Sequence, residues 1–522
     1  MAKHRKAEQL PVRRWLTLSA ASAGMGAALW GLSLAGPQVG VASADTESSV
    51  SVSAGDSGTA QTGPKRAERR AERAEKRAEK RAGAAREIEA LSGRHRAVTA
   101  DRSPRSDTAG ADTAEPTTPR RTPQERAAAV IDDMTASALT WIDSRPVSDA
   151  RKERLEQAWS TTRRTLLNQA PTVNPVQVTG VMEGPISGTV GAEDPDGDRL
   201  VYRVVKKPTT GTVAVNRDGS YTYTPGDGFN GVDTFVVAAR DLGLHVNVLN
   251  WFRPALTRTE SVINHRAITY DFTWVGDEWT PDRKAAFQRA ADYIAGYFVV
   301  RKPVALSYEL AAINDPAYLV NASTQAAFTD PPGLMQPVIQ KEVITGFDDG
   351  DGDVQAFMEW NFAWKWATGD VIADDEMDFQ NTARHELLHS FGIYSLNGSP
   401  DDNPNSWASI YDSFLTFVDG TPLLAPDGSL RPGAADAIKG LNGGVYFSGP
   451  HAVAAYGKPI PVSADEGSRL SHLPRSVFSG DDFKLMNDKS PGPGWHNVRD
   501  ISPIEYGMLQ DIGYTMRPKP IS

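Results

Sequence analysis

The sequence predicts a multidomain protein: a disordered and helical N-terminal region, then a small all-β sandwich, then a C-terminal α+β domain. Three observations support this order. The 522 residues exceed the length of about 250 to 300 residues beyond which single cores usually split. Charged, low-complexity sequence gives way near residue 171 to short alternating runs broken by Gly, Pro, Asp and Asn. From about residue 241 strand-like and helix-like patterns alternate.

A signal peptide is expected over residues 1–44. Arg13 and Arg14 precede an apolar run from Trp15 to Leu34, and Ala42-Ser43-Ala44 fits a cleavage site. An uncleaved membrane anchor is the alternative, because the apolar run is close to spanning length. We therefore expect a secreted, extracellular protein, with association to the cell surface left open.

Residues 45–123 form a charged, low-complexity region, predicted to be largely disordered. Within it, Lys65 to Arg86 places Glu and Arg or Lys three and four residues apart, which favours a solvated single helix. This basic helix is either a spacer or a contact to an anionic cell envelope. Residues 124–170 read as a helical segment, and the pattern leaves open whether it is a hairpin or a removable prosegment.

Residues 171–240 predict a β-sandwich, because short strand patterns recur between turn residues. Three strings within it resemble the cadherin-like or immunoglobulin-like repeats of bacterial surface proteins: Glu193 to Asp198, Asp218 to Pro225 and Phe229 to Phe235. The resemblance covers about 70 residues.

Calcium is a possible cofactor at two places. Asp194, Asp196 and Asp198 could ligate Ca²⁺, but three carboxylates are too few alone, and turn-forming Asp explains them equally well. The acidic string from Asp348 to Asp353 fails the EF-hand spacing, so a solvated loop is the alternative there.

The chemistry of residues 241–522 centres on His385-Glu386-Leu387-Leu388-His389. Residues four apart lie on one helix face, so both imidazoles can reach one Zn²⁺ while Glu386 stands beside its water as a general base. Two surface histidines on an ordinary helix are the alternative. A catalytic zinc site needs a third ligand, and downstream of the helix only His451, His472 and His496 remain.

Gly392 lies three residues after His389 and lets the helix end. Together these residues match the first part of the metzincin pattern H-E-x-x-H-x-x-G-x-x-H. The chain departs from the pattern at Ser395, the position of the third His. The chain from about 265 to 515 resembles the leishmanolysin-like branch of metzincins, which insert a long stretch before that His. The strings that carry this are Ser471-His472-Leu473, Leu485-Met486-Asn487-Asp488 and the ending from Ile501 to Tyr514.

This resemblance implies a zincin-type domain in which His472 is the third ligand and Met486 forms a turn beneath the imidazoles. His451 and His496 remain alternative ligands, as does an acidic ligand, Asp401 or Asp402.

The expected function is therefore a secreted zinc-dependent metalloendopeptidase acting on a protein or peptide substrate. A cell-surface adhesion or scaffold protein with a degenerate zincin domain is the alternative, because Ser395 breaks the pattern. With no cysteine, the fold has no disulfides, and a propeptide thiolate cannot cap the zinc. The net charge of −10 argues against a nucleic-acid partner.

Overall fold

The computed structural model describes residues 15–20, 123–242, 246, 248, 256–318, 321–329, 333–347, 354–398, 407–490, 492–495 and 498–518. Apart from Trp15–Ala20, the predicted signal peptide lies outside the described residues, as does the charged segment from Lys65 to Arg86. The acidic string at 348–353 and the alternative ligands Asp401, Asp402 and His496 also lie outside them.

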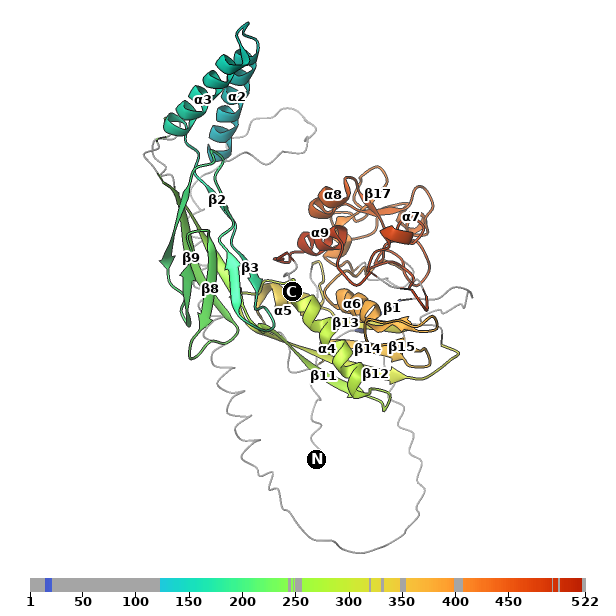
Figure 1. Cartoon of the computed structure of the whole chain (residues 1–522). Helices are drawn as coiled ribbons and strands as arrows, with labels where there is room; N and C mark the ends of the chain where they lie inside the picture. Colours follow the sequence, from blue (N-terminus) through green and yellow to red (C-terminus); the bar gives the residue numbers. More distant parts are fainter. Residues whose placement is uncertain are drawn as a thin grey trace, which may run out of the picture. The chain divides into compact units, whose positions relative to one another are not determined.

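The predicted helical segment contains two helices, α2 (Pro123–Asp143) and α3 (Asp149–Leu166), which pack together as a hairpin (Figure 1). Ile131 and Ile142 are buried, whereas Trp141 stays exposed. A pair of helices shares only one face, so part of the apolar pattern remains in solvent. No helix among the described residues is both long and apolar enough to cross a membrane.

The predicted sandwich consists of antiparallel sheets that share one core. A four-stranded sheet has the order β3-β4-β8-β7, a three-stranded sheet has the order β10-β9-β6, and β2 pairs with β5. The strands are β2 (Thr172–Val173), β3 (Val176–Thr179), β4 (Ile186–Thr189), β5 (Ala192–Glu193), β6 (Leu200–Lys206), β7 (Gly211–Val215), β8 (Ser220–Pro225), β9 (Val232–Asp241) and β10 (Leu256–Asn264). Tyr221 of one sheet packs edge-on against Phe235 of the other, with ring centroids 5.2 Å apart.

Strand β10 extends this region beyond the boundary that the sequence predicted between residues 240 and 241. It pairs with β9 from Leu256 opposite Arg240 to Asn264 opposite Val232. Asn264 is also tied to β3, because its backbone N–H donates to the side chain of Gln177 over 2.8 Å. The sandwich therefore ends near residue 264.

The C-terminal region is built on a mixed sheet of order β1-β13-β14-β12-β11 (Figure 1). Its strands are β1 (Trp15–Ala20), β11 (Ile268–Val275), β12 (Val304–Ile313), β13 (Ala322–Ala327) and β14 (Ala356–Asn361). Strands β11, β12 and β14 run parallel, whereas β13 runs antiparallel to β14 and β1 antiparallel to β13.

Among the described elements, the helices α4 (Pro281–Ala295), α5 (Val338–Thr345) and α6 (Phe379–Ser390) pack with this sheet, and α4 contacts α6. Thr280 followed by Pro281 is a helix start signal in the sequence, and α4 begins there, with the Thr280 side chain accepting a hydrogen bond from the Arg283 backbone. Trp360 of β14 and Phe379 of α6 are fully buried, with ring centroids 4.5 Å apart. Helix α6 is therefore held in the core rather than on the surface.

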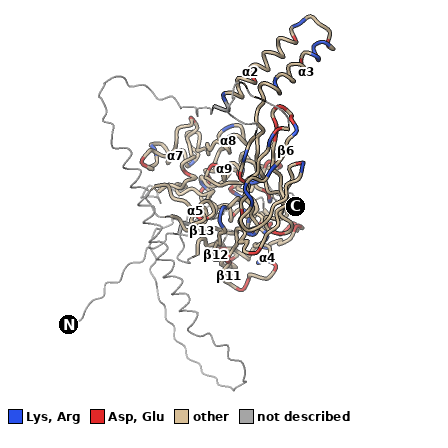
Figure 2. Tube along the Cα trace, turned by 90° about the vertical axis from the view of Figure 1, so that its left-hand side faces the viewer, with Lys and Arg blue, Asp and Glu red and all other residues tan. Residues whose placement is uncertain are grey.

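The chain after α6 has mostly short elements. They are the 3-10 helices Tyr411–Phe414 and Gly480–Asp482, the strands β17 (Leu415–Phe417), β18 (Val445–Phe447) and β19 (Ile460–Pro461), and the helices α7 (Ala434–Ile438), α8 (Pro450–Tyr456) and α9 (Pro503–Asp511). Helix α9 starts at Ser502 with a capping box to Glu505, as its Ser-Pro sequence predicts. Figure 2 shows acidic and basic residues interspersed along the described elements.

Candidate metal centre

Helix α6 is fixed at both ends by contacts that its sequence explains. The side chain of Asp378 caps its first turn by accepting from the backbone N–H groups of Gln380 and Asn381, and Arg499 pairs with the same carboxylate at 2.8 Å. After the helix, Gly392 adopts φ 104°, a conformation that favours glycine. This agrees with the predicted turn at Gly392. His385 and His389 consequently project from one face, one turn apart.

Three imidazoles converge on one point in the buried interior. The Nε2 atoms of His385, His389 and His472 form a triangle in which each side measures 3.1 Å. The three residues are at most 6% exposed. The structure thus brings His472 to the predicted pair, across more than 80 residues of intervening chain.

The opposite nitrogen of each ring faces a backbone carbonyl. The Nδ1 pairs are His385 with Leu485 at 2.7 Å, His389 with Ile393 at 2.9 Å and His472 with Ser468 at 3.0 Å. A carbonyl oxygen only accepts, so in the neutral rings each Nδ1 carries the proton and each Nε2 presents a lone pair. The contacts between the Nε2 atoms therefore cannot be hydrogen bonds.

The neutral state of these rings follows from their burial. Desolvation lowers the pKa of His385 to about 4 and that of His472 to about 3, and it holds the pKa of His389 well below its ordinary value. Three neutral nitrogens with converging lone pairs repel one another unless a cation lies between them.

The residues fit zinc in type and spacing. Tetrahedral coordination with Zn–N distances of about 2.0 to 2.1 Å would place the nitrogens about 3.3 Å apart, close to the observed triangle. Backbone acceptors on the outer nitrogens are the usual means of fixing the tautomer and orientation of a metal-ligating His.

Glu386 lies beside this triangle and is completely buried. The Thr324 hydroxyl donates to its Oε2 over 2.7 Å, whereas Oε1 has no hydrogen-bond partner among the described residues. Burial raises the pKa of this carboxyl to about 8. A buried carboxyl with one open oxygen and a pKa near neutrality suits a group that takes up and returns a proton.

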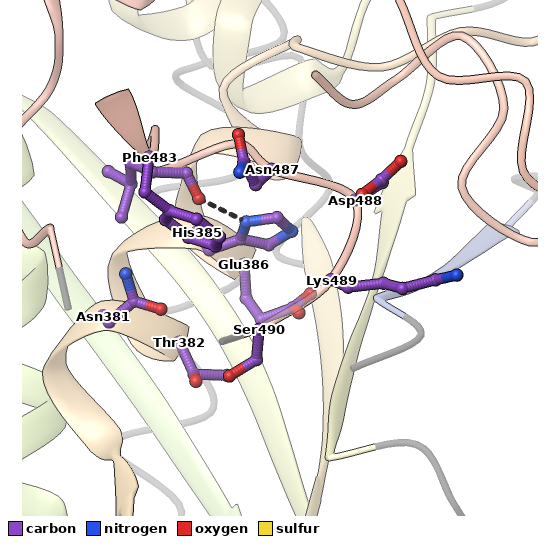
Figure 3. A pocket seen from close by; sticks show the side chains of 10 residues that line it. Asn381, Thr382, His385, Glu386, Phe483, Asn487, Asp488, Lys489 and Ser490 are labelled. Carbon is purple, nitrogen blue, oxygen red and sulfur yellow. Dashed lines mark hydrogen bonds between the residues drawn. The ribbon is translucent and has the colours of Figure 1, made fainter. Parts of the chain in front are cut away.

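A pocket opens beside His385 and Glu386 (Figure 3). One wall comes from α6 and the other from residues 483–490. Its remaining lining residues are Asn381, Thr382, Phe483, Leu485, Asn487, Asp488, Lys489 and Ser490. Figure 3 shows the hydrogen bond from the His385 ring to the backbone carbonyl of the facing wall. A small molecule in this pocket could therefore meet both the His385 ring and the Glu386 carboxyl.

The segment that carries His472 is held by pairing with the segment that carries Met486. The Leu473 N–H donates to the Met486 carbonyl over 2.8 Å, and the Asp488 N–H donates to the Leu473 carbonyl over 2.9 Å. Met486 is fully buried, which is expected both of a methionine turn beneath the imidazoles and of an ordinary core methionine. Glu505 of α9 accepts from the Met486 N–H over 2.6 Å, so α9 supports this turn.

Ser395 ties the loop after α6 to the segment of His472. Its backbone N–H donates to Ser471 Oγ over 2.8 Å, and its hydroxyl donates to the buried carboxylate of Asp412. His451, the alternative ligand on α8, is exposed and does not belong to the triangle. Ser395 thus does not supply the third imidazole; its hydrogen bond to Ser471 helps to hold the segment that carries His472.

Several groups that support the rings were not predicted from the sequence. Thr324 comes from β13, and the carbonyls of Ile393, Ser468 and Leu485 orient the rings. The Leu485-Met486 string was the only available signal, because carbonyl directions cannot be read from residue types.

Comparison with known proteins bears on the Ig-like region. Residues 168–244 match the family described as bacterial Ig domain, which covers the predicted sandwich. Proteins called sphingomyelinase from Mycobacterium bovis and Mycobacterium tuberculosis are 43% identical over 94 aligned residues. That alignment covers 16% of this chain and 18% of each relative. The shared stretch is thus a small part of those proteins.

Proposed function

We propose that the C-terminal region is a zincin-type, zinc-dependent metalloendopeptidase of an exported protein. The observation that carries this proposal is the triangle of buried, neutral imidazoles formed by His385, His389 and His472, with the open carboxylate oxygen of Glu386 beside it. A helix with two histidines four residues apart would not by itself require either the third ring or the buried acid.

Each residue would have a separate task. Zinc bound by the three Nε2 atoms would polarise the scissile carbonyl and acidify a water. Glu386 would accept the proton of that water at Oε1 and deliver it to the leaving amine. Thr324 would hold the other carboxylate oxygen, so that the open one faces the reaction.

The sheet supports a peptide substrate. Strand β13 carries Thr324, so its outer edge runs next to Glu386. Trp15–Ala20 pairs antiparallel with that edge along all of β13, from Trp15 opposite Ala327 to Ala20 opposite Ala322. An extended peptide could add to the same edge through main-chain hydrogen bonds once the proposed signal peptide is removed.

Replacement of the general base tests the proposal. The purified protein should contain about one zinc per chain and hydrolyse unfolded casein. Glu386→Gln should keep the zinc, because no ligand changes, yet lose at least about 10²-fold in kcat/KM, since general-base catalysis is worth that much or more. Zinc is measured by mass spectrometry and cleavage by release of fluorescent peptides.

Glu466→Gln, which alters an exposed glutamate, is the matched control and should leave both readouts unchanged. Wild-type protein that holds zinc but cleaves neither casein nor a mixed peptide library would contradict the peptidase proposal. The adhesion or scaffold alternative would then be favoured. Wild-type protein without zinc would contradict the metal centre itself.

A further inference from the structure

A second group of metal-ligand side chains lies in the Ig-like region. The loop between β5 and β6 carries Asp194, Asp196 and Asp198, hereafter the aspartate loop. Each residue offers a carboxylate oxygen, and these oxygens lie within 4.8 Å of one another. Three acidic residues in a turn do not by themselves define a metal site. Whether they can bind an ion depends on the groups around them.

A fourth carboxylate comes from another element. Asp241 ends β9, is only 3% exposed, and lies within hydrogen-bonding reach of the Asp194 carboxyl. Its Oδ2 accepts from the Asn168 side chain over 2.6 Å, but its Oδ1 has no hydrogen-bond partner among the described residues. The same holds for Oδ2 of Asp194. The buried Asp241 and the half-buried Asp194 therefore meet, and each has a buried oxygen that no donor among the described residues reaches.

The described cations lie on one side of this group. Arg163 of α3 contacts Asp196 at 2.6 Å, and Arg164 lies 3.9 Å from Asp198. Among the described residues, neither guanidinium group pairs with the facing carboxylates of Asp194 and Asp241. Burial, together with Asp194 and Asp198, raises the pKa of Asp241 to about 7. Such a shift means that the ionised pair is unfavourable without a further cation.

We propose that the aspartate loop and Asp241 together bind one calcium ion. All the candidate ligand atoms are oxygens, whereas zinc prefers nitrogen and sulfur ligands, so the site does not favour zinc. Calcium takes six to eight oxygens at about 2.3 to 2.6 Å in flexible geometry, so four carboxylates plus water can satisfy it. Magnesium demands stricter octahedral geometry and gives up its water reluctantly. A divalent ion would also compensate the facing carboxylates of Asp194 and Asp241.

Calcium at this place links three parts of the chain. Asn168 follows α3 and holds Asp241, and the neighbouring backbone N–H of Gln169 donates to Asp196 over 2.7 Å. The aspartate loop belongs to the β5–β6 connection, and Asp241 belongs to β9. The ion therefore fixes the end of the helical hairpin against the Ig-like sheets.

The experiment uses the full chain, saturated with zinc so that the His site is filled, in buffer freed of calcium. Equilibrium dialysis with radioactive calcium should show one bound ion per chain, with a Kd of about 10⁻³ M or tighter, the range of extracellular modules. Asp241→Asn should weaken this binding at least about tenfold while its zinc content stays unchanged. Asp218→Asn, an exposed acid in the β7–β8 turn, is the matched control and should bind calcium like the wild type.

Thermal unfolding gives a second readout, in which the order of the two melting temperatures should depend on calcium. Without calcium, Asp241→Asn should melt above the wild type, because it removes a buried like-charge contact. With 5 mM calcium the order should reverse, since only the wild type gains binding energy. The proposal is overturned if calcium does not bind, if Asp241→Asn binds it as well as the wild type does, or if 5 mM magnesium stabilises the wild type equally.

Discussion

Two unlike regions assemble the candidate metal centre. Helix α6 supplies His385, Glu386 and His389 within five consecutive residues, and their directions follow from the helical period. Residues 468–488, hereafter the 468–488 segment, supply His472 and the Leu485 carbonyl that orients His385. This segment contains one short 3-10 helix and otherwise irregular backbone. One half of the site is thus set by local geometry and the other by tertiary hydrogen bonds.

This difference indicates which half of the site is more sensitive to substitutions elsewhere in the chain. The helical half would keep its spacing in any fold that forms α6. The 468–488 segment holds its imidazole through contacts between distant residues, among them those of Leu473 with Met486, Met486 with Glu505 and Ser471 with Ser395. Substitutions outside the site can therefore disturb the third ligand more easily than the first two.

The largest expected effect comes from removing the ring that the segment contributes. His472→Ala should lose bound zinc and hydrolysis as completely as His385→Ala, because two imidazoles do not close a catalytic zinc site. We expect zinc affinity to fall more than about 10²-fold, beyond the loss typical of an outer-shell change. Competition with a chromogenic chelator measures it.

His451→Ala on the exposed face of α8 serves as the control and should retain zinc and activity. If His472→Ala kept its zinc, the two halves would not share one metal, and the comparison between them would fail.

A smaller effect should come from the support of the helical half. Thr324→Val removes the hydroxyl that donates to Glu386, and that hydrogen bond lowers the pKa of the carboxyl. Without it the pKa rises, so the base is deprotonated only at higher pH. We expect the acid limb of the pH profile of kcat/KM to move to higher pH. The value of kcat/KM should fall about tenfold at pH 7 and less at pH 9.

Thr324→Ser keeps a hydroxyl and should restore the profile. A pH profile of Thr324→Val identical to the wild type would show that this hydroxyl does not act through Glu386.

The smallest effect on activity should come from the tether between the halves. Ser395→Ala keeps the backbone bond to Ser471 but removes one donor from Asp412, whose pKa burial already raises. The sequence alone predicts a nearly neutral substitution. The buried hydroxyl instead predicts a loss of about 1 to 3 kcal/mol in unfolding free energy at neutral pH.

The sign of the pH dependence follows from Asp412. A raised pKa means that this carboxyl contributes full stability at low pH and loses it as pH rises through the folded-state value. Losing a donor raises that pKa further, so the cost of Ser395→Ala should grow with pH. Urea unfolding at pH 4.5 and pH 7.5 measures it, with the exposed Ser413→Ala as control. A cost that shrank with rising pH would contradict this account.

The sequence by itself determined the elements whose signals are local. Thr280 with Pro281 marked the start of α4, Ser502 with Pro503 marked that of α9, and Gly392 marked the turn after α6. These signals depend on neighbours within a few residues, so they survive without knowledge of the fold. Strand alternation likewise located the Ig-like sheets, although it did not show that β10 belongs to them.

Only the tertiary structure decided which distant groups meet. His472 reaches the helical pair through a segment with almost no regular structure, and Asp241 reaches Asp194 across several strands. Residue spacing carries no information about such contacts, because chain separation beyond one element does not fix distance. Burial then sets the chemistry, as it holds the imidazoles neutral and raises the pKa of Glu386, and burial is a property of the packed molecule.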